Sequence, residues 1–283
     1  LAPSSRTTAV SRGGFDGVDL PGLAAELDAL QSGQEQLVIA GADEAVVATS
    51  NGSDLVIVGG CYQSYPACLI VPESSPIKAP ADLKGKTVGT PGRKGETWYA
   101  LQLAMDTASL SESDLTIQDI GYTQQAALVG GKVDAVVGFS NNDAIQIRQA
   151  GTPVRTIQVA DRIPLVGVSL VTTRSLLDSR RQDLETVVKA SIKGMTAFVK
   201  DPDAAVEATK DHMDDLKVDQ TQAARAREVA VATGKLVSGD GSHPIGSVRV
   251  DDIASMIEFL TSHKLLGDKK TPKAAEVCVP LTQ

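Results

Sequence analysis

A segment that reads as helix, strand, loop and helix occurs twice in this chain, and this repeat is the strongest constraint on its fold. The second copy spans residues 121–151, where a short helix is followed by GG, the apolar run AVVG and the polar loop FSNND. The first copy spans residues 30–52, with LQSG and LVIA standing 98 residues ahead of their counterparts. Alternating strands and helices favour parallel sheets with right-handed crossovers. The repeat therefore predicts an α/β protein of two similar lobes that face each other across a cleft.

The order of the predicted elements also suggests where the lobes divide. A linker with three prolines at 72–80 separates the first set of apolar runs from the second. Four helical patterns then follow, at 181–199, 202–213, 220–233 and 247–263. We predict a first lobe from residues 1–71 and 166–283 and a second lobe from residues 76–163. The chain would cross between them near residues 67–71 and 165–171.

Polar loops that follow the repeated strands are the expected ligand site, because open α/β sheets bind ligands at the carboxyl ends of their strands. The second copy offers one aromatic face and several hydrogen-bonding groups there: Phe139, Ser140, Asn141, Asn142 and Asp143. Its counterpart in the first copy is Ala42, Asp43 and Glu44. These residue types also cap helices, so a capping role stays open. Two adjacent asparagines exceed what one cap requires, which favours a site.

A glycine-rich loop, GTPGRKG at 89–95, joins a predicted strand to a predicted helix. It matches neither the phosphate-binding loop nor the dinucleotide fingerprint. A helix N-terminus can nevertheless hold an anionic or polar group, so Thr90, Gly92 and Arg93 are candidate ligand residues. Arg93 fits a solvated surface charge equally well.

A further loop follows the predicted strand at 55–58 and carries Tyr62 and Gln63. An aromatic ring in such a loop could stack on a ligand, so both residues are candidates for the site. The single tryptophan, Trp98, has helical spacing with Leu101 and Met105, which predicts a core position.

Patterns for catalysis or metal binding do not occur in the sequence. It has no GxSxG, no CxxC and only three scattered histidines, so we expect no catalytic residue, no metal and no cofactor. Cys61, Cys68 and Cys278 could form a disulfide in an oxidising compartment or be three buried thiols.

Composition limits the partners. A hydrophobic fraction of 42% is normal for a globular protein with a core. The net charge of −8 argues against a nucleic-acid or anionic-membrane surface. No stretch approaches the roughly 20 apolar residues of a membrane span. A small-molecule ligand is the partner that the cleft predicts.

Three motifs together resemble a known family. The run APADLKGKTVG at 79–89 is similar to the DLKGKxVG opening of the second lobe in bacterial substrate-binding proteins. GKVDA at 131–135 with GFSNND at 138–143 resembles the GKVDA…GYxNNEP segment of the branch for thiamine-pyrimidine precursors, riboflavin, sulfonates, taurine and nitrate. AGADE at 40–44 is similar to the same branch's IAGAD motif. The resemblance covers roughly residues 23–200.

This resemblance implies a type II periplasmic-binding-protein fold, with two lobes, a two-strand hinge and a helical C-terminal region. It implies an extracytoplasmic monomer, often lipid-anchored, that delivers a solute to the transmembrane subunits of an ABC permease. Family members begin with a strand, an aromatic loop and a helix that residues 1–17 are too few to hold. Either this wall is absent or it belongs to residues that precede Leu1.

Three ligand classes remain open at this point. A pyrimidine- or flavin-like heterocycle would use Tyr62 or Phe139 for stacking and the Asn141–Asn142 pair for its polar ring atoms. A sulfonate, taurine or nitrate anion would need N–H donors and a cation such as Arg93. A pyrimidine-precursor synthase shares the implied fold but carries a cysteine-rich motif and an active-site histidine. The asparagine pair favours the uncharged heterocycle.

Overall fold

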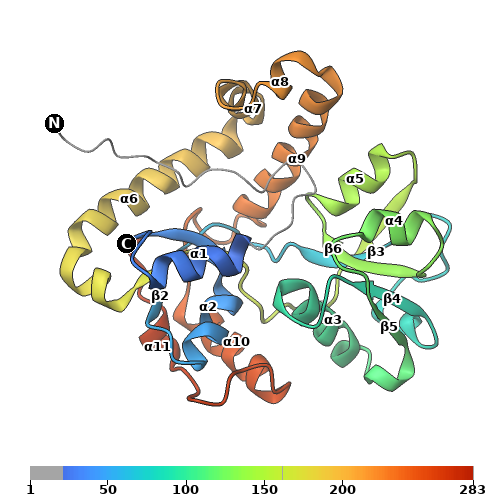
Figure 1. Cartoon of the computed structure of the whole chain (residues 1–283), viewed down its shortest axis with the longest axis horizontal. Coiled ribbons are helices and arrows are strands. Elements are labelled where there is room, and N and C mark those ends of the chain that lie inside the picture. Colours follow the sequence, from blue (N-terminus) through green and yellow to red (C-terminus); the bar gives the residue numbers. More distant parts are fainter. Residues whose placement is uncertain (1–21, 161, 283) are drawn as a thin grey trace.

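A computed structural model of the chain describes residues 22–160 and 162–282, and it contains two separate β-sheets. Figure 1 shows them in two lobes that lie side by side, with helices packed around each. The first sheet has the strand order β1 (Val38–Gly41), β8 (Val168–Thr173), β2 (Leu55–Gly60). The second has the order β5 (Thr116–Asp119), β4 (Thr87–Thr90), β6 (Ala135–Phe139), β3 (Ala67–Pro72), β7 (Val154–Ile157).

The sequence repeat corresponds to a repeat of structure. In the first lobe, β1 leads through α2 (Ala42–Ser50) to β2, and in the second, β6 leads through α5 (Asp143–Gln149) to β7. In each lobe the two repeat strands flank a strand from elsewhere in the chain. That inserted strand is β8 in the first lobe and β3 in the second, and it runs antiparallel to both neighbours.

The predicted parallel sheets are therefore only partly correct. Within the described chain, β4 pairs in parallel with β5 and β6, whereas every pairing of the first sheet is antiparallel. The reason is the inserted strand: β1 and β2 run in the same direction, as a crossover through α2 requires, but β8 lies between them. A fully buried apolar run gives no sign of the direction of its neighbours.

The strand pairing places the end of the first lobe earlier in the chain than expected. We assigned residues 67–71 to the first lobe, but β3 pairs with β6 and β7 of the second sheet. The chain thus leaves the first sheet at residues 61–66 and returns after β7. The two crossing segments meet where the N–H groups of Cys61 and Tyr62 both donate to the carbonyl of Val168, at 2.9 and 3.1 Å. We refer to this meeting point of the two crossing segments as the hinge region.

Helices cover the sheets of both lobes and bury their apolar faces. The helices of the first lobe are α1 (Gly22–Gln31), α2, α10 (Val250–Ser262) and α11 (Ala274–Val277). Those of the second are α3 (Gly95–Thr107), α4 (Gln124–Val129) and α5, with 3-10 turns at Pro80–Leu83 and Glu112–Asp114. Trp98 is only 5% exposed, which confirms its predicted core position. Cys61, Cys68 and Cys278 are buried free thiols.

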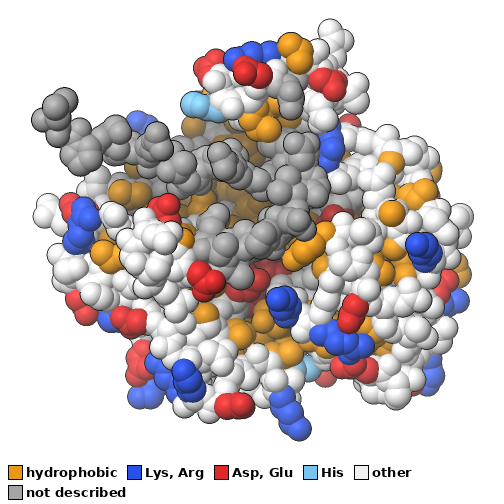
Figure 2. Space-filling view, in the orientation of Figure 1, with side chains coloured by type: hydrophobic (Ala, Val, Ile, Leu, Met, Phe, Trp, Pro, Cys, Tyr) orange, Lys and Arg blue, Asp and Glu red, His pale blue; other side chains and the backbone are white. Residues whose placement is uncertain are grey.

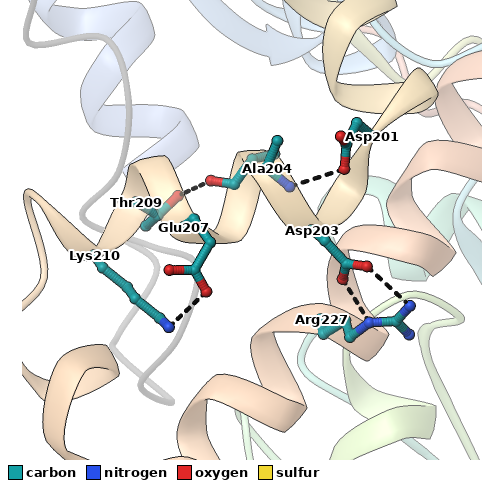
Figure 3. A network of polar contacts seen from close by, with 8 residues as sticks. Asp201, Asp203, Ala204, Glu207, Thr209, Lys210 and Arg227 are labelled. Carbon is teal, nitrogen blue, oxygen red and sulfur yellow. Dashed lines mark hydrogen bonds and ion pairs between the residues drawn. The ribbon is translucent and has the colours of Figure 1, made fainter.

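The C-terminal region contains the four predicted helices, with shifted ends and one short addition. They are α6 (Arg174–Lys200), α7 (Pro202–Lys210), α8 (Asp215–Val218), α9 (Gln220–Ser238) and α10. Figure 3 shows how α7 is fixed: the Asp201 side chain accepts from the N–H of Ala204 and caps the helix, and Arg227 of α9 pairs with Asp203. Such exposed ion pairs contribute little stability, typically ~0.2–1 kcal/mol.

The surface shows no strong segregation of charge on the face drawn in Figure 2, where acidic and basic side chains are interspersed. Among the described helices, none combines the length and the apolar composition that a membrane crossing requires.

Candidate functional site

The carboxyl ends of strands from both lobes face each other beside the hinge, and a cavity of about 420 Å³ lies between them. Its first wall comes from α1 and α2, the helix that follows β1. The opposite wall comes from the loop between β4 and α3, the start of α3, and the end of β6. The described lining residues are Leu27, Asp28, Gln31, Glu44, Val47, Ala48, Pro91, Gly92, Lys94, Gly95, Glu96, Thr97, Tyr99, Tyr122 and Phe139. Glu44 lies in the helix after β1 and Phe139 ends β6, so the cavity lies at the repeated strand ends where we expect the ligand site.

The cavity combines aromatic walls with carboxylic acids. Tyr99, Tyr122 and Phe139 supply flat apolar surface from the second lobe. Glu44 enters from the first lobe and Glu96 from the second, and Lys94 is the cation among the described lining residues. A few polar groups on mostly apolar walls are typical of pockets for small organic molecules.

Three carboxylic acids are buried together at this point. Asp43 is fully buried and Glu96 is 4% exposed, while Glu44 is partly exposed to the cavity. Burial raises the pKa of Asp43 to about 8, with a further contribution from the neighbouring charge of Glu44. Burial also raises the pKa of Glu44, although Lys94 opposes this, and it raises the pKa of Glu96 well above its usual range. The floor of the site is therefore acidic and holds protons more tightly than free carboxylic acids do.

Tyr65, in the crossing segment, connects two of these acids. Its hydroxyl lies 2.7 Å from Oδ2 of Asp43 in the first lobe and 3.1 Å from the backbone carbonyl of Glu96 in the second. The other carboxylate oxygen of Asp43 accepts from the N–H of Glu44 at 2.7 Å. Asp43 is thus fully hydrogen-bonded behind the cavity.

Of the residues predicted for the site, Glu44, Gly92 and Phe139 line this cavity. Ala42 and Asp43 are buried behind it at the start of α2. Thr90 is also buried, and its hydroxyl donates to the carbonyl of Gly92 at 3.2 Å, so it shapes the loop.

Arg93 does not lie in the cavity wall. Its guanidinium pairs with Glu112 and Asp119 and lies 5.1 Å from the centre of the Trp98 ring. The predicted cation for an anionic ligand is therefore directed to the surface of the second lobe, which agrees with the surface-charge alternative. Two acidic partners and a ring face outside the loop explain this orientation.

The asparagine pair also forms its contacts outside the cavity lining. The amide of Asn141 donates to the hydroxyl of Thr233 in α9 at 2.9 Å. The side-chain oxygen of Asn142 accepts from Gln146 one turn further along α5 at 2.7 Å.

The neighbours of this pair have structural contacts as well. The Ser140 N–H donates to the carbonyl of Pro66 at 3.0 Å, and the Asp143 carboxylate accepts from the N–H of Phe139 at 2.7 Å. Phe139 is thus the residue of this loop that lines the cavity, whereas the described contacts of the other four residues are structural.

Tyr62 and Gln63 line a second, smaller cavity of about 190 Å³ beside the hinge. Gln63 forms two hydrogen bonds with Ser247, one from its Nε2 to the Ser247 carbonyl and one from the Ser247 hydroxyl to its Oε1, both 3.0 Å. Burial raises the pKa of Tyr62 to about 12. These two predicted residues are therefore not among the described lining residues of the main cavity, and the Tyr62 phenol instead bonds with Asn141 and Thr233.

Several residues of the main cavity were not predicted. Lys94 belongs to the glycine-rich loop, Glu96 and Tyr99 follow that loop in α3, and Tyr122 precedes α4. The position of that loop at the carboxyl end of β4 was the available signal, since it places the first turn of α3 at the site. The wall from α1 had no such signal, because its lining residues belong to an ordinary amphipathic pattern.

Fold and cavity together define a protein of the periplasmic-binding type: two α/β lobes, two crossing segments, and a pocket between the lobes. The model of the family "NMT1/THI5 like" matches residues 21–205, and the chain belongs to this family. The chain is 32% identical over 162 residues to the riboflavin-binding protein RibY of Chloroflexus aurantiacus, covering 57% of this chain and 46% of that protein. This match thus spans less than half of that relative.

Other relatives agree with this assignment. The formylaminopyrimidine-binding protein of Halalkalibacterium halodurans is 22% identical over 238 residues, which is 83% of this chain and 71% of that protein. The alkanesulfonate-binding protein SsuA of Xanthomonas axonopodis pv. citri, in complex with MOPS, has a TM-score of 0.67 at 19% identity. That comparison covers 93% of this chain and 86% of SsuA, and it shows the shared fold.

Proposed function

We propose that this chain is the extracytoplasmic solute-binding protein of an ABC importer and that its ligand is a small heterocycle of pyrimidine or flavin type. The observation that carries the proposal is the cavity itself, in which aromatic walls and carboxyl groups meet between two lobes. Tyr99 and Phe139 can pack against a planar ring, and the carboxyl groups can accept its N–H groups. The names of the riboflavin and formylaminopyrimidine relatives support the same class of ligand.

The alternative of a sulfonate, taurine or nitrate ligand is less well supported by the charges around the cavity. Glu44 and Glu96 line it, whereas Arg93 pairs with acidic residues elsewhere. Lys94 remains as a cation in the wall, and the SsuA likeness rests on fold alone. An anion beside two carboxyl groups would be repelled wherever those groups are ionised.

A role in binding without catalysis also agrees with the site. The described lining residues include no cysteine and no histidine. Burial raises the pKa of Cys61 and Cys68 to about 12, so neither thiol is an available nucleophile at neutral pH. The partners of such a protein are its solute and the transmembrane subunits of the permease. The protein would act as a monomer that delivers the solute to these subunits.

Calorimetric titration with riboflavin, a formylaminopyrimidine and MOPS tests this proposal. We expect saturable one-to-one binding of at least one heterocycle, weaker binding of MOPS, and recovery of the ligand chemically intact. Phe139→Ala should weaken heterocycle binding at least tenfold, while Val218→Ala, at an 83% exposed position of α8, should not change it. Tight binding of MOPS alone would favour the anion alternative, and conversion of the ligand would indicate an enzyme.

A further inference from the structure

The geometry points to Glu44, together with Glu96, as the acceptor of the ligand's N–H groups, so that the site selects heterocycles with an amino or imide N–H. This inference rests on the proposed function and adds the residues that determine specificity. It also states which edge of the ligand they bind.

The first observation is an unpaired carboxylate oxygen in the cavity wall. Glu44 lines the cavity from α2, and its Oε2 is buried and has no hydrogen-bond partner among the described residues. The backbone N–H of Gly41 is the group nearest to a partner, and it lowers the pKa of the Glu44 carboxyl against the larger effect of burial. Nearly all buried polar atoms in native proteins have such a partner. Because this acceptor lacks a donor and belongs to a side chain that lines the cavity, it is the candidate partner for a donor on the ligand.

The second observation comes from the other lobe. Glu96 also lines the cavity, is 4% exposed, and its Oε1 likewise has no partner within the described chain. Its carbonyl is already used by Tyr65, which fixes the first turn of α3. The two side chains thus line opposite walls of one cavity, and each carries one carboxyl oxygen without a partner among the described residues.

The charged groups that surround Glu44 determine the expected effect of pH. Lys94, Asp28, Glu96 and the phenol of Tyr99 share the cavity wall with it. Asp43 lies behind the wall, where the phenol of Tyr65 contacts it. A carboxyl group accepts best when it is ionised, and burial raises the pKa of Glu44. A ligand that donates N–H bonds should therefore bind more tightly as pH rises, whereas an anion should bind less tightly.

Two pairs of probes that differ in one donor group test the inference. The first pair is riboflavin and 3-methylriboflavin, in which the ring N–H is blocked. The second is 4-amino-2-methylpyrimidine and 4-methoxy-2-methylpyrimidine. For the wild-type protein we expect the donor-bearing member of at least one pair to bind at least tenfold more tightly, and its affinity to increase between pH 5 and 8.

Glu44→Gln and Glu96→Gln identify the acceptors, and both remove a buried acid while they preserve its shape. Glu44→Gln, at least, should reduce the preference for the donor-bearing probe to about twofold. It should also make the affinity for that probe nearly independent of pH. Glu112→Gln, an exposed acid paired with Arg93 away from the cavity, should retain the full preference and serves as the control.

Equal binding of the two members within both pairs, or a preference that survives both glutamine variants, would overturn the inference and leave the proposed function intact. Failure of all four probes to bind the wild-type protein would instead overturn the proposed heterocycle ligand, and this inference with it.

Discussion

The hydroxyl of Tyr65 lies 2.7 Å from Oδ2 of Asp43, so the crossing segment is hydrogen-bonded to the start of α2 in the first lobe. The same hydroxyl lies 3.1 Å from the Glu96 carbonyl of the second lobe. One phenolic proton cannot serve two acceptors at once. The phenol donates to Asp43, and this bond lowers the pKa of Asp43 against the larger effect of burial. The Glu96 carbonyl is the alternative acceptor, so this one side chain links the crossing segment to both lobes.

Removing this phenol should destabilise the protein. Tyr65→Phe removes the phenol that bonds Oδ2 of Asp43 and approaches the Glu96 carbonyl, in a buried place. Loss of one partner of a buried hydrogen bond typically costs about 1–3 kcal/mol. We expect a lower free energy of unfolding by about this amount in urea denaturation. Tyr122→Phe, at a 55% exposed position, is the matched control and should unfold like the wild type; equal stability of both variants would contradict the role of Tyr65.

The buried acids should make the protein less stable as pH rises. Asp43 loses its proton near 3.8 in the unfolded chain but only near 8 in the folded protein. Between these values the folded state binds more protons, so the free energy of unfolding decreases with increasing pH. One such group contributes a slope of up to about 1.4 kcal/mol per pH unit, and Glu44 and Glu96 act in the same direction.

Thermal melts from pH 5 to 8 would measure this effect. Tm should fall across this window in the wild type, and Asp43→Asn should make the fall shallower because position 43 then carries no titrating group. The exposed variant Glu112→Gln should follow the wild-type curve. A Tm that rises from pH 5 to 8 in the wild type, with Asp43→Asn unchanged, would refute the assignment.

Substitutions of Asn141 and Asn142 can distinguish a structural role of this pair from a ligand-binding role. In the structure, Asn141 bonds to Thr233 and Asn142 to Gln146, so both amides already have partners outside the cavity lining. We expect Asn141→Ala to lower the stability of the ligand-free protein by about 0.5–1.5 kcal/mol and to leave affinity within twofold. Thr233→Val removes the same bond from the other side and should have a similar effect. A tenfold loss of affinity for Asn142→Ala at unchanged Tm would restore the sequence-based expectation that this loop contacts the ligand.

Local patterns explain why much of this fold could be predicted. The repeated units predicted β1 with α2 and β6 with α5. Apolar strands, polar strand ends and helix starts can be recognised from neighbouring residues alone. The repeated strand ends predicted Glu44 and Phe139 as site residues, and the glycine-rich loop predicted Gly92; all three line the main cavity.

Long-range pairing explains the errors. The insertion of β8 between β1 and β2 joins segments that lie more than 100 residues apart, and its apolar run carries no alternation that would reveal its neighbours. The same limit applies to side-chain direction. Arg93 turns toward Glu112, and Asn141 turns toward Thr233 of α9, which is distant in the sequence.

Two glycines of one loop offer the sharpest test of the cavity wall. Gly95 starts α3 with a φ of +74°, and a Cβ there would lie 3.1 Å from Oε1 of Glu44. Gly95→Ala should therefore lower stability by about 1–2 kcal/mol through backbone strain, and displacement of Glu44 should also weaken ligand binding.

Gly92 lines the same cavity, but a Cβ there meets no atom within 4 Å and its φ is not in the strained range. Gly92→Ala should consequently leave stability within about 0.5 kcal/mol of the wild type. Urea denaturation and titration with riboflavin on both variants distinguish the two positions; if Gly95→Ala behaves like Gly92→Ala in both measurements, Gly95 does not set the position of Glu44.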